Sequence, residues 1–198
     1  MVQHIGRKFF HLFGGFGLLS LYWLFGLHNA LIAYCLILFA VLAVDMARLH
    51  FAVLNEFIMA RFSSFIRENE ANKLTGIVPY VTGIGLTFLF YRPYIATMAI
   101  LFLICGDVAA TTVGELFGQT KIAGNKSLEG SVAFFVAACM STIQFNLFAV
   151  APPYGVLLFG AVVATWIELL PLPLNDNLTI PLAAGGAMEL LSRMIGGL

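Results

Sequence analysis

Long runs without any charged residue alternate with short polar stretches along this chain, and the longest runs cover residues 9–44 and 130–167. About 20 apolar residues in a helix cross the hydrocarbon core of a bilayer, so each of these runs is too long for one crossing. Turn-forming residues divide them near Gly26 and at Pro152-Pro153. The pattern therefore predicts seven helical spans, although six are also compatible with it: 9–26, 29–47, 74–91, 93–116, two within 130–167, and 178–195.

The stretch 48–73 differs, because its apolar residues recur at helical spacing while charged residues take the other faces. This pattern predicts an amphipathic helix that lies in the membrane interface. The alternative is a helical extension of the second span. The apolar positions are Leu54, Phe57, Ile58, Phe62, Phe65 and Ile66, and the charged ones are Glu56, Arg61, Arg67 and Glu68.

Composition strengthens the membrane interpretation. Of the 198 residues, 61% are hydrophobic and 10% are charged, whereas soluble domains carry roughly 25% charged residues. This excludes a cytosolic enzyme, a nucleic-acid binder and a disordered chain. We expect an all-α, polytopic integral membrane protein with a single membrane domain over 1–198. Its cysteines, Cys35, Cys105 and Cys139, all lie in apolar runs, which predicts neither a disulfide nor a zinc site.

Basic residues orient the predicted spans, because cytoplasmic segments carry an excess of lysine and arginine. With the N-terminus inside, only Arg92 and Arg193 fall outside. The polar clusters of the chain are then all predicted on the cytoplasmic side. The basic residues on that side are Arg7, Lys8, Arg48, Arg61, Arg67, Lys73, Lys121 and Lys126.

The segment 106–131 holds the densest group of candidate functional residues. On a helix, Asp107, Ala110, Gly114 and Gly118 share one face. An ionisable residue at membrane depth is costly, so Asp107 is a candidate for function. For the glycines alone, close helix packing is the favoured interpretation. For the charged group as a whole a functional site is favoured, because Asp107 is followed by Lys121, Lys126, Ser127, Glu129 and Gly130.

Lys126-Ser127 resembles the end of a P-loop, but the spacing is wrong. Five residues separate Gly118 from Gly124, and Asn125 intervenes before the lysine. The sequence therefore predicts no P-loop NTPase. The physical principle still holds, because backbone N–H groups exposed at glycines, together with lysines, bind phosphates.

Two further clusters fall on the same predicted side. Arg7, Lys8 and His11 occupy one helical turn, and membrane anchoring explains the two basic residues but not the histidine. Asp176-Asn177 precedes the last span, where the pair is either a helix N-cap or a ligand for Mg²⁺ or a hydroxyl. Glu70 and Glu168 are weaker candidates.

Taken in order, these motifs resemble a family of membrane enzymes over most of the chain: dolichol kinase, phytol kinase and the CTP-dependent diacylglycerol kinase, with prokaryotic relatives labelled phosphatidate cytidylyltransferase-like. Each motif is weak by itself, and their order on one membrane side makes the set specific. The motifs are Arg7-Lys8-x-x-His11, Gly106-Asp107-x-x-Ala110-x-x-x-Gly114-x-x-Phe117-Gly118 with Lys121, Lys126-Ser127-x-Glu129-Gly130, and Asp176-Asn177-x-x-Ile180-Pro181.

The resemblance implies Mg²⁺-dependent transfer of the γ-phosphoryl group of CTP to a lipid alcohol at the cytoplasmic face, where the alcohol is a polyprenol, a phytol-like prenol or diacylglycerol. His11 is then a proton carrier or an orienting group. Metal binding or hydroxyl activation falls to Asp107, Glu129 and Asp176. Phosphate and nucleotide binding falls to Arg7, Lys8, Gly114, Gly118, Lys121, Lys126, Ser127, Gly130 and Asn177.

Two other functions stay open on the sequence. One is a phosphatidate cytidylyltransferase, although the long signature with paired aspartates that marks that family is not found. The other is a non-enzymatic transporter that uses Asp107 for ions, against which no paired repeat is evident. For a kinase we expect the lipid to arrive from the inner leaflet, past Phe62 and Phe65.

Overall fold

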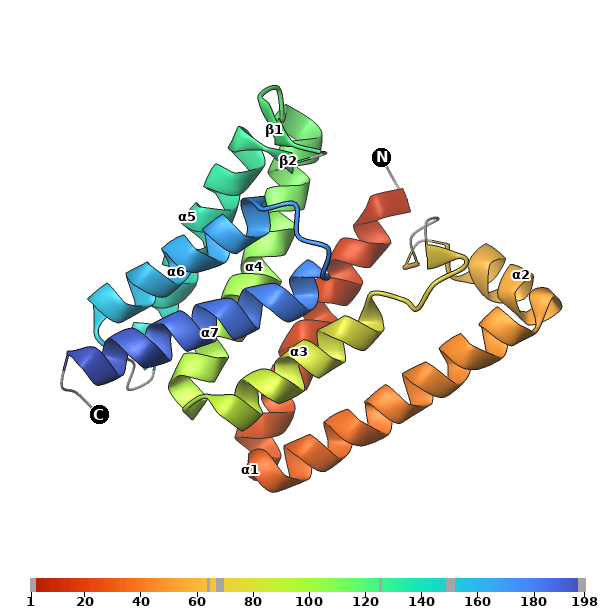
Figure 1. Ribbon diagram of the computed structural model, residues 1–198, viewed down its shortest axis with the longest axis horizontal. Helices are drawn as coiled ribbons and strands as arrows, with labels where there is room; N and C mark the ends of the chain where they lie inside the picture. The colour runs from red at the N-terminus through yellow and green to blue at the C-terminus, as the bar shows by residue number, and fades with distance from the viewer. Residues whose placement is uncertain (1–2, 64, 67–69, 125, 149–151, 196–198) are drawn as a thin grey trace. The chain divides into compact units, whose positions relative to one another are not determined.

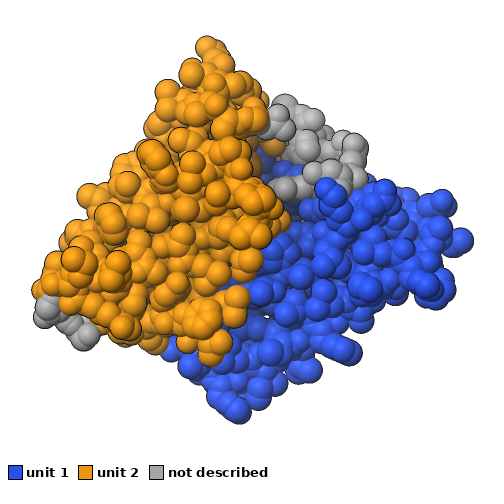
Figure 2. Space-filling model, in the orientation of Figure 1, with its two compact units in different colours: residues 1–85 blue, residues 86–198 orange. Residues whose placement is uncertain are grey.

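The computed structural model describes residues 3–63, 65–66, 70–124, 126–148 and 152–195. These residues form seven helices and one two-stranded hairpin (Figure 1), which confirms the all-α class apart from the hairpin. The chain divides into two compact units, Met1–Gly85 and Leu86–Leu198 (Figure 2). The single membrane domain over 1–198 stays a prediction.

The first unit begins with the predicted helical hairpin. Helix α1, Gln3–His50, is interrupted at Gly26, whose φ of 75° and ψ of 171° are not helical. Glycine reaches this conformation because it has no Cβ. The Tyr34 hydroxyl donates a hydrogen bond of 2.7 Å to the Leu18 carbonyl and so joins the two arms. The break expected after residue 26 is therefore confirmed.

A separate short helix, α2, follows at Ala52–Arg61. Phe51 between the two helices is extended, with φ −110° and ψ 105°. The alternative of a continuous extension of the second span is therefore wrong. No residue of α2 is buried, and its placement in the membrane interface stays a prediction.

The amphipathic helix is shorter than the apolar pattern through Ile66 predicts, because α2 ends at Arg61. Phe62 leaves the helical conformation at φ −116°, and its carbonyl accepts the N–H groups of Phe65 and Ile66 in a turn. Beyond the helix, Phe62, Phe65 and Ile66 line a cavity together with residues of α1. Arg67 and Glu68 lie outside the described residues.

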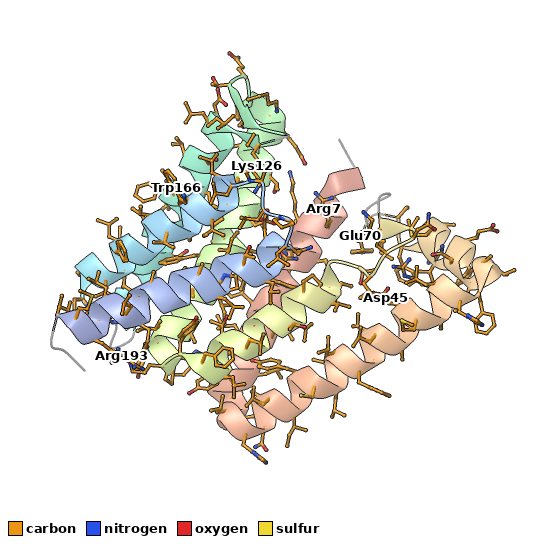
Figure 3. The ribbon with its side chains drawn as sticks, in the orientation of Figure 1. Arg7, Asp45, Glu70, Lys126, Trp166 and Arg193 are labelled. Carbon is orange, nitrogen blue, oxygen red and sulfur yellow. The ribbon has the colours of Figure 1, made fainter. Side chains whose placement is uncertain are left out.

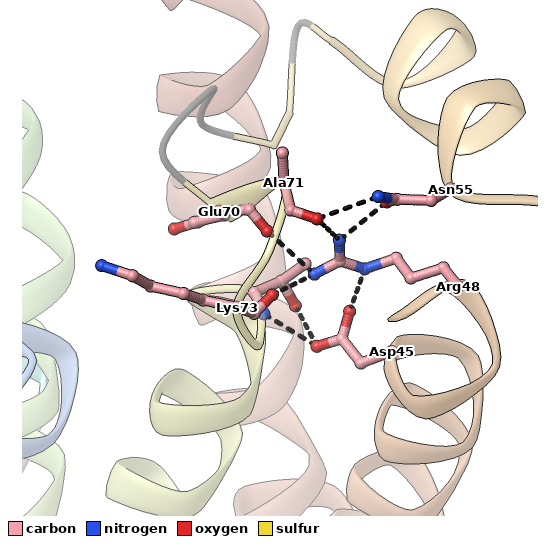
Figure 4. Close-up of polar contacts among 7 residues, drawn as sticks. Asp45, Arg48, Asn55, Glu70, Ala71 and Lys73 are labelled. Atoms are coloured by element: carbon pink, nitrogen blue, oxygen red, sulfur yellow. Dashed lines mark hydrogen bonds and ion pairs between the residues drawn. The ribbon is translucent and has the colours of Figure 1, made fainter. Parts of the chain in front are cut away.

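A buried ion pair fixes the end of α1 to the segment that precedes α3 (Figure 4). The Arg48 guanidinium donates to Asp45 at 2.7 Å, to Asn55 at 3.1 Å, and to the carbonyls of Glu70, Ala71 and Lys73. Asp45 in turn accepts the backbone N–H of Thr75 at 2.8 Å and its hydroxyl at 3.0 Å. Both charged side chains are almost fully buried, at 1% and 3% exposed. We call this network the Arg48 clamp.

The second unit is built around one buried helix. Helix α3, Ile77–Phe90, contains the boundary between the units, and α4, Pro93–Phe117, follows it. The side chains of α4 from Ile95 to Ile104 are almost all buried. They pack against α5, Leu128–Phe148, α6, Tyr154–Leu169, and α7, Asp176–Met194.

Helix lengths support part of the predicted membrane topology. Among the described residues, two helical segments, Gly6–His50 and Pro93–Phe117, are long and apolar enough to cross a bilayer. Ile77–Phe90, Leu128–Ile143 and Tyr154–Leu169 are apolar but shorter. The positions of the predicted helices agree with the structure within a few residues, whereas seven membrane crossings stay a prediction.

Candidate functional site

A short β-hairpin positions the central lysine of the second unit. Strand β1, Lys121–Ala123, pairs antiparallel with β2, Lys126–Ser127, and Gly124 turns the chain with a φ of +55°. Strands of three and two residues are too short to display an alternating pattern in the sequence. In this register Lys121 lies opposite Ser127 and Ala123 opposite Lys126.

The Lys126 side chain leaves β2 toward the connection between α6 and α7 (Figure 3). Its ammonium lies 3.0 Å from a carboxylate oxygen of Asp176 and 3.9 Å from one of Glu168. It also donates a hydrogen bond to the Glu168 backbone carbonyl. That carbonyl belongs to the last turn of α6, where the helix dipole attracts a cation. Lys126 therefore joins three elements in one polar cluster.

Asp176 reaches this lysine because of how α7 begins. The N-cap of α7 is Asn175, whose side chain accepts the backbone N–H of Asn177 at 3.0 Å. The capping role considered for Asp176-Asn177 is thus carried by the residue before the pair. Asp176 is the first residue of the helix, which leaves its carboxylate for Lys126. Asn177 is half-buried in the first turn.

Two more carboxylates belong to the same neighbourhood. Glu168 is buried, and it accepts a hydrogen bond of 3.0 Å from the Ser131 hydroxyl. Lys126 attracts the Glu168 carboxylate, while Asp176 and Asp107 repel it. We call Asp107, Lys126, Glu168 and Asp176 the Lys126 cluster. It contains three carboxylates and one lysine.

The sequence ranked Glu168 too low and missed Ser131. Glu168 carries the same signal as Asp107, an acidic side chain within an otherwise apolar helix. Glu168 is the weaker candidate on the sequence because it lies near the predicted end of its span. Ser131 has no sequence signal that separates it from other small residues of α5.

The Glu129 carboxylate contacts the backbone at the start of the hairpin. Its carboxylate accepts the backbone N–H of Thr120 at 3.1 Å and 3.3 Å, just before β1. Hydrogen bonds from backbone N–H groups, its own first, hold the pKa of this carboxyl below its usual range. These contacts give Glu129 a role in shaping the hairpin, and its part in metal binding stays a prediction. Lys121 is exposed on the same hairpin.

The glycines and Ser127 form the contact between α4 and the start of α5. A Cβ at Gly114 would lie 3.3 Å from the Ser127 hydroxyl, one at Gly118 only 2.6 Å, and one at Gly130 only 2.9 Å from the Ala110 carbonyl. The Ser127 hydroxyl itself accepts the N–H of Gly130 at 3.2 Å, as an N-cap does. This geometry supports the packing interpretation of the small residues, and nucleotide binding by them stays a prediction.

The N-terminal candidates lie in the first unit. Arg7 and Lys8 are half-buried on α1. His11 is buried, its ring stacks on Tyr80 with centroids 4.3 Å apart, and its carbonyl accepts the Tyr80 hydroxyl at 2.8 Å. These contacts orient the imidazole within the unit. Convergence of these residues with Asp107 and Asp176 in one cavity stays a prediction.

Whether these residues suit Mg²⁺ depends on how many of its ligands the protein has to supply. Among the described residues, no three His, Cys, Asp or Glu side chains are grouped so that they alone hold a metal ion. Mg²⁺ that arrives with a nucleotide needs only one or two carboxylates, because phosphates and water supply the other oxygen ligands. Asp107 and Asp176, whose charges both act on Glu168, are the carboxylates that would supply these ligands.

Comparison with known proteins identifies three relatives, each named CTP-dependent diacylglycerol kinase 1. The protein from Eremothecium gossypii is 32% identical over 146 residues, which is 72% of this chain and 46% of the relative. The Schizosaccharomyces pombe protein is 31% identical over 140 residues, which is 64% of each. The Saccharomyces cerevisiae protein is 29% identical over 206 residues, which is 90% of this chain and 70% of the relative.

This chain thus spans less than two thirds of the length of two of these relatives. No family model matches the chain, and no solved structure matches it.

Proposed function

We propose, from the similarity of the chain to three CTP-dependent diacylglycerol kinases, that it belongs to the CTP-dependent lipid kinases, that it transfers the γ-phosphoryl group of CTP to the hydroxyl of a lipid alcohol, and that diacylglycerol is the acceptor. The observation that carries this proposal is the Lys126 cluster, in which a lysine and carboxylates from four separate elements are gathered. Phosphoryl transfer depends on positioning and charge stabilisation, which such a group supplies.

In the proposed reaction the acceptor oxygen forms a bond to the γ-phosphorus, the bond to the bridging oxygen breaks, and CDP leaves. The hydroxyl proton passes to a carboxylate of the Lys126 cluster. Lys126, whose side chain is 25% exposed, lies beside the phosphate oxygens as a point charge. Ser131 and Lys126 hold the Glu168 carboxylate in position.

Asp107 and Asp176 are the residues that we propose to hold Mg²⁺ together with the nucleotide. When bound there, Mg²⁺ would offset the negative charge of the phosphates. An excess of carboxylates repels free CTP, so the cluster favours the nucleotide in its metal complex. The excess of basic residues in segments on one predicted side supports a site that faces the cytoplasm.

The test is the fate of labelled CTP. Purified protein in detergent is supplied with CTP labelled at the γ position, then at the α position, together with diacylglycerol, a polyprenol or phosphatidate. We expect the γ label to enter diacylglycerol and form phosphatidate, with release of CDP. Transfer to the polyprenol alone would replace the proposed acceptor. Transfer of the α label to phosphatidate, with release of pyrophosphate, would identify a cytidylyltransferase instead.

Replacing Lys126 by alanine is expected to raise the KM for CTP by about 10- to 100-fold, which corresponds to the loss of a hydrogen bond to a charged group. The KM for the lipid should change little, because a neutral hydroxyl does not need this charge. Initial rates at varied concentrations of each substrate provide the measurement. Lys73→Ala is the matched control, since that side chain is exposed in the first unit. An unchanged KM for CTP would remove Lys126 from the phosphate site.

A further inference from the structure

A cavity of ≈ 470 Å³ lies within the first unit, and none of the residues assigned to phosphoryl transfer lines it. Its lining includes residues from the C-terminal half of α1 and, from the following stretch, Ile58, Phe62, Phe65 and Ile66. The rings of Phe10 and Phe65 meet edge to face at 5.9 Å and belong to the same lining. The apolar lining residues are Phe10, Ala40, Val41, Val44, Ile58, Phe62, Phe65, Ile66 and Ile77.

The polar side chains of the lining are Asp45, Arg48 and Thr75, and all three belong to the Arg48 clamp (Figure 4). The Arg48 guanidinium donates to protein oxygens, and both oxygens of the Asp45 carboxylate accept hydrogen bonds from protein donors. The cavity therefore offers hydrocarbon contacts and leaves these charges engaged with one another. A nucleotide or a charged headgroup is a poor match for such a lining.

The Arg48 clamp also connects elements that line the cavity. It connects α1 to α2 through Asn55 and to the segment that precedes α3 through the carbonyls of Glu70 and Ala71. Phe62 and Phe65 lie along the chain between these two points of attachment. The volume falls within the roughly 300–1,000 Å³ that is typical of ligand cavities. An apolar cavity is a poor site for ordered water.

We propose that this cavity binds one hydrocarbon chain of a diacylglycerol acceptor. The proposal rests on the proposed lipid kinase function for the identity of the lipid, and on the lining and the Arg48 clamp for the class of ligand. The proposal gives Phe62 and Phe65 a role in lipid binding that is separate from the role of the Lys126 cluster in phosphoryl transfer.

The test is photo-crosslinking in the absence of CTP. The protein is placed in phosphatidylcholine vesicles with diacylglycerol that carries a diazirine on one acyl chain, and the labelled residues are mapped by mass spectrometry. We expect label on Val41, Ile58, Phe62 and Phe65. Phosphatidylcholine with the same diazirine chain is the control lipid. Equal labelling by both lipids, or label spread over all apolar helices, would overturn the proposal in favour of bulk lipid contact.

Two matched variants sharpen the result. Both Ala40 and Ala43 are exposed on the same helix, but only Ala40 belongs to the lining of the cavity. Ala40→Trp should reduce labelling of Ile58 and Phe62 by about tenfold, since a bulky side chain fills the space. Ala43→Trp should leave labelling unchanged. An equal effect of both variants would overturn the proposal.

The readout is independent of catalysis, so it separates two kinds of failure. Cavity labelling without γ-phosphoryl transfer would sustain the binding site and refute the kinase. Transfer without cavity labelling would sustain the kinase and refute the binding site.

Discussion

Asp107→Asn is expected to lower the rate of γ-phosphoryl transfer by about 100-fold or more, which is the usual loss when a charge-stabilising group is removed from an active site. Stability should change little, because the asparagine has nearly the same shape as the half-buried aspartate that it replaces. The initial rate with labelled CTP and the temperature of thermal unfolding in detergent provide the two measurements.

The Mg²⁺ dependence identifies the role of Asp107. If this carboxylate helps to hold the metal with the nucleotide, the variant should need a higher Mg²⁺ concentration for half of its residual activity. Glu115→Gln is the matched control, because Glu115 is an exposed acidic residue of the same helix. A wild-type rate in Asp107→Asn would make Asp107 structural, and an unchanged Mg²⁺ dependence would assign it to the acceptor hydroxyl instead.

Arg48→Ala is expected to destabilise the first unit by about 3–5 kcal/mol, because it leaves the Asp45 carboxylate buried without its ion-pair partner. The carbonyls of Glu70, Ala71 and Lys73 lose a donor at the same time. Chemical unfolding in detergent, followed by circular dichroism, measures the loss. Limited proteolysis should also cut more rapidly between α2 and α3.

Two further variants test the explanation for Arg48. Arg61→Ala removes an exposed arginine at the end of α2 and should change stability by less than about 0.5 kcal/mol. Asp45→Asn combined with Arg48→Met removes both charges of the pair and should be less destabilising than Arg48→Ala alone. Equal losses in the single and double variants would show that packing, and not the unpaired charge, dominates.

The hydrophobic pattern predicted the helices well, because chain breaks come from strictly local chemistry. Gly26 adopts a positive φ at the predicted turn, and Pro153 precedes α6 where the charge-free run was divided. The same method failed beyond Arg61, where the apolar residues keep a helical spacing although the helix has ended. Periodicity describes which faces are apolar, but it does not reveal that Phe62 and Phe65 face a cavity against α1.

The candidate site was predicted in part. Lys126 and Asp176 were singled out from distant segments, and they lie 3.0 Å apart. Asp107 belongs to the same neighbourhood, whereas Glu129 bonds to the hairpin and Glu168 replaces it near the lysine. The separation of residues along the chain does not reveal which acidic side chain lies next to Lys126, because that depends on the direction in which each helix end points.

The sequence by itself determined the helical class, the break at Gly26 and the acidic and basic residues available for chemistry, because these follow from local conformational preference and from the cost of charge among apolar residues. The tertiary structure alone decided which charges meet. Lys126 is joined to Glu168 by the end of α6 and to Asp176 by the start of α7. Arg48 is satisfied by carbonyls more than twenty residues away, at Glu70 and Ala71. Such pairings require packed helices that bring remote groups within hydrogen-bond distance, and no local pattern in the chain encodes them.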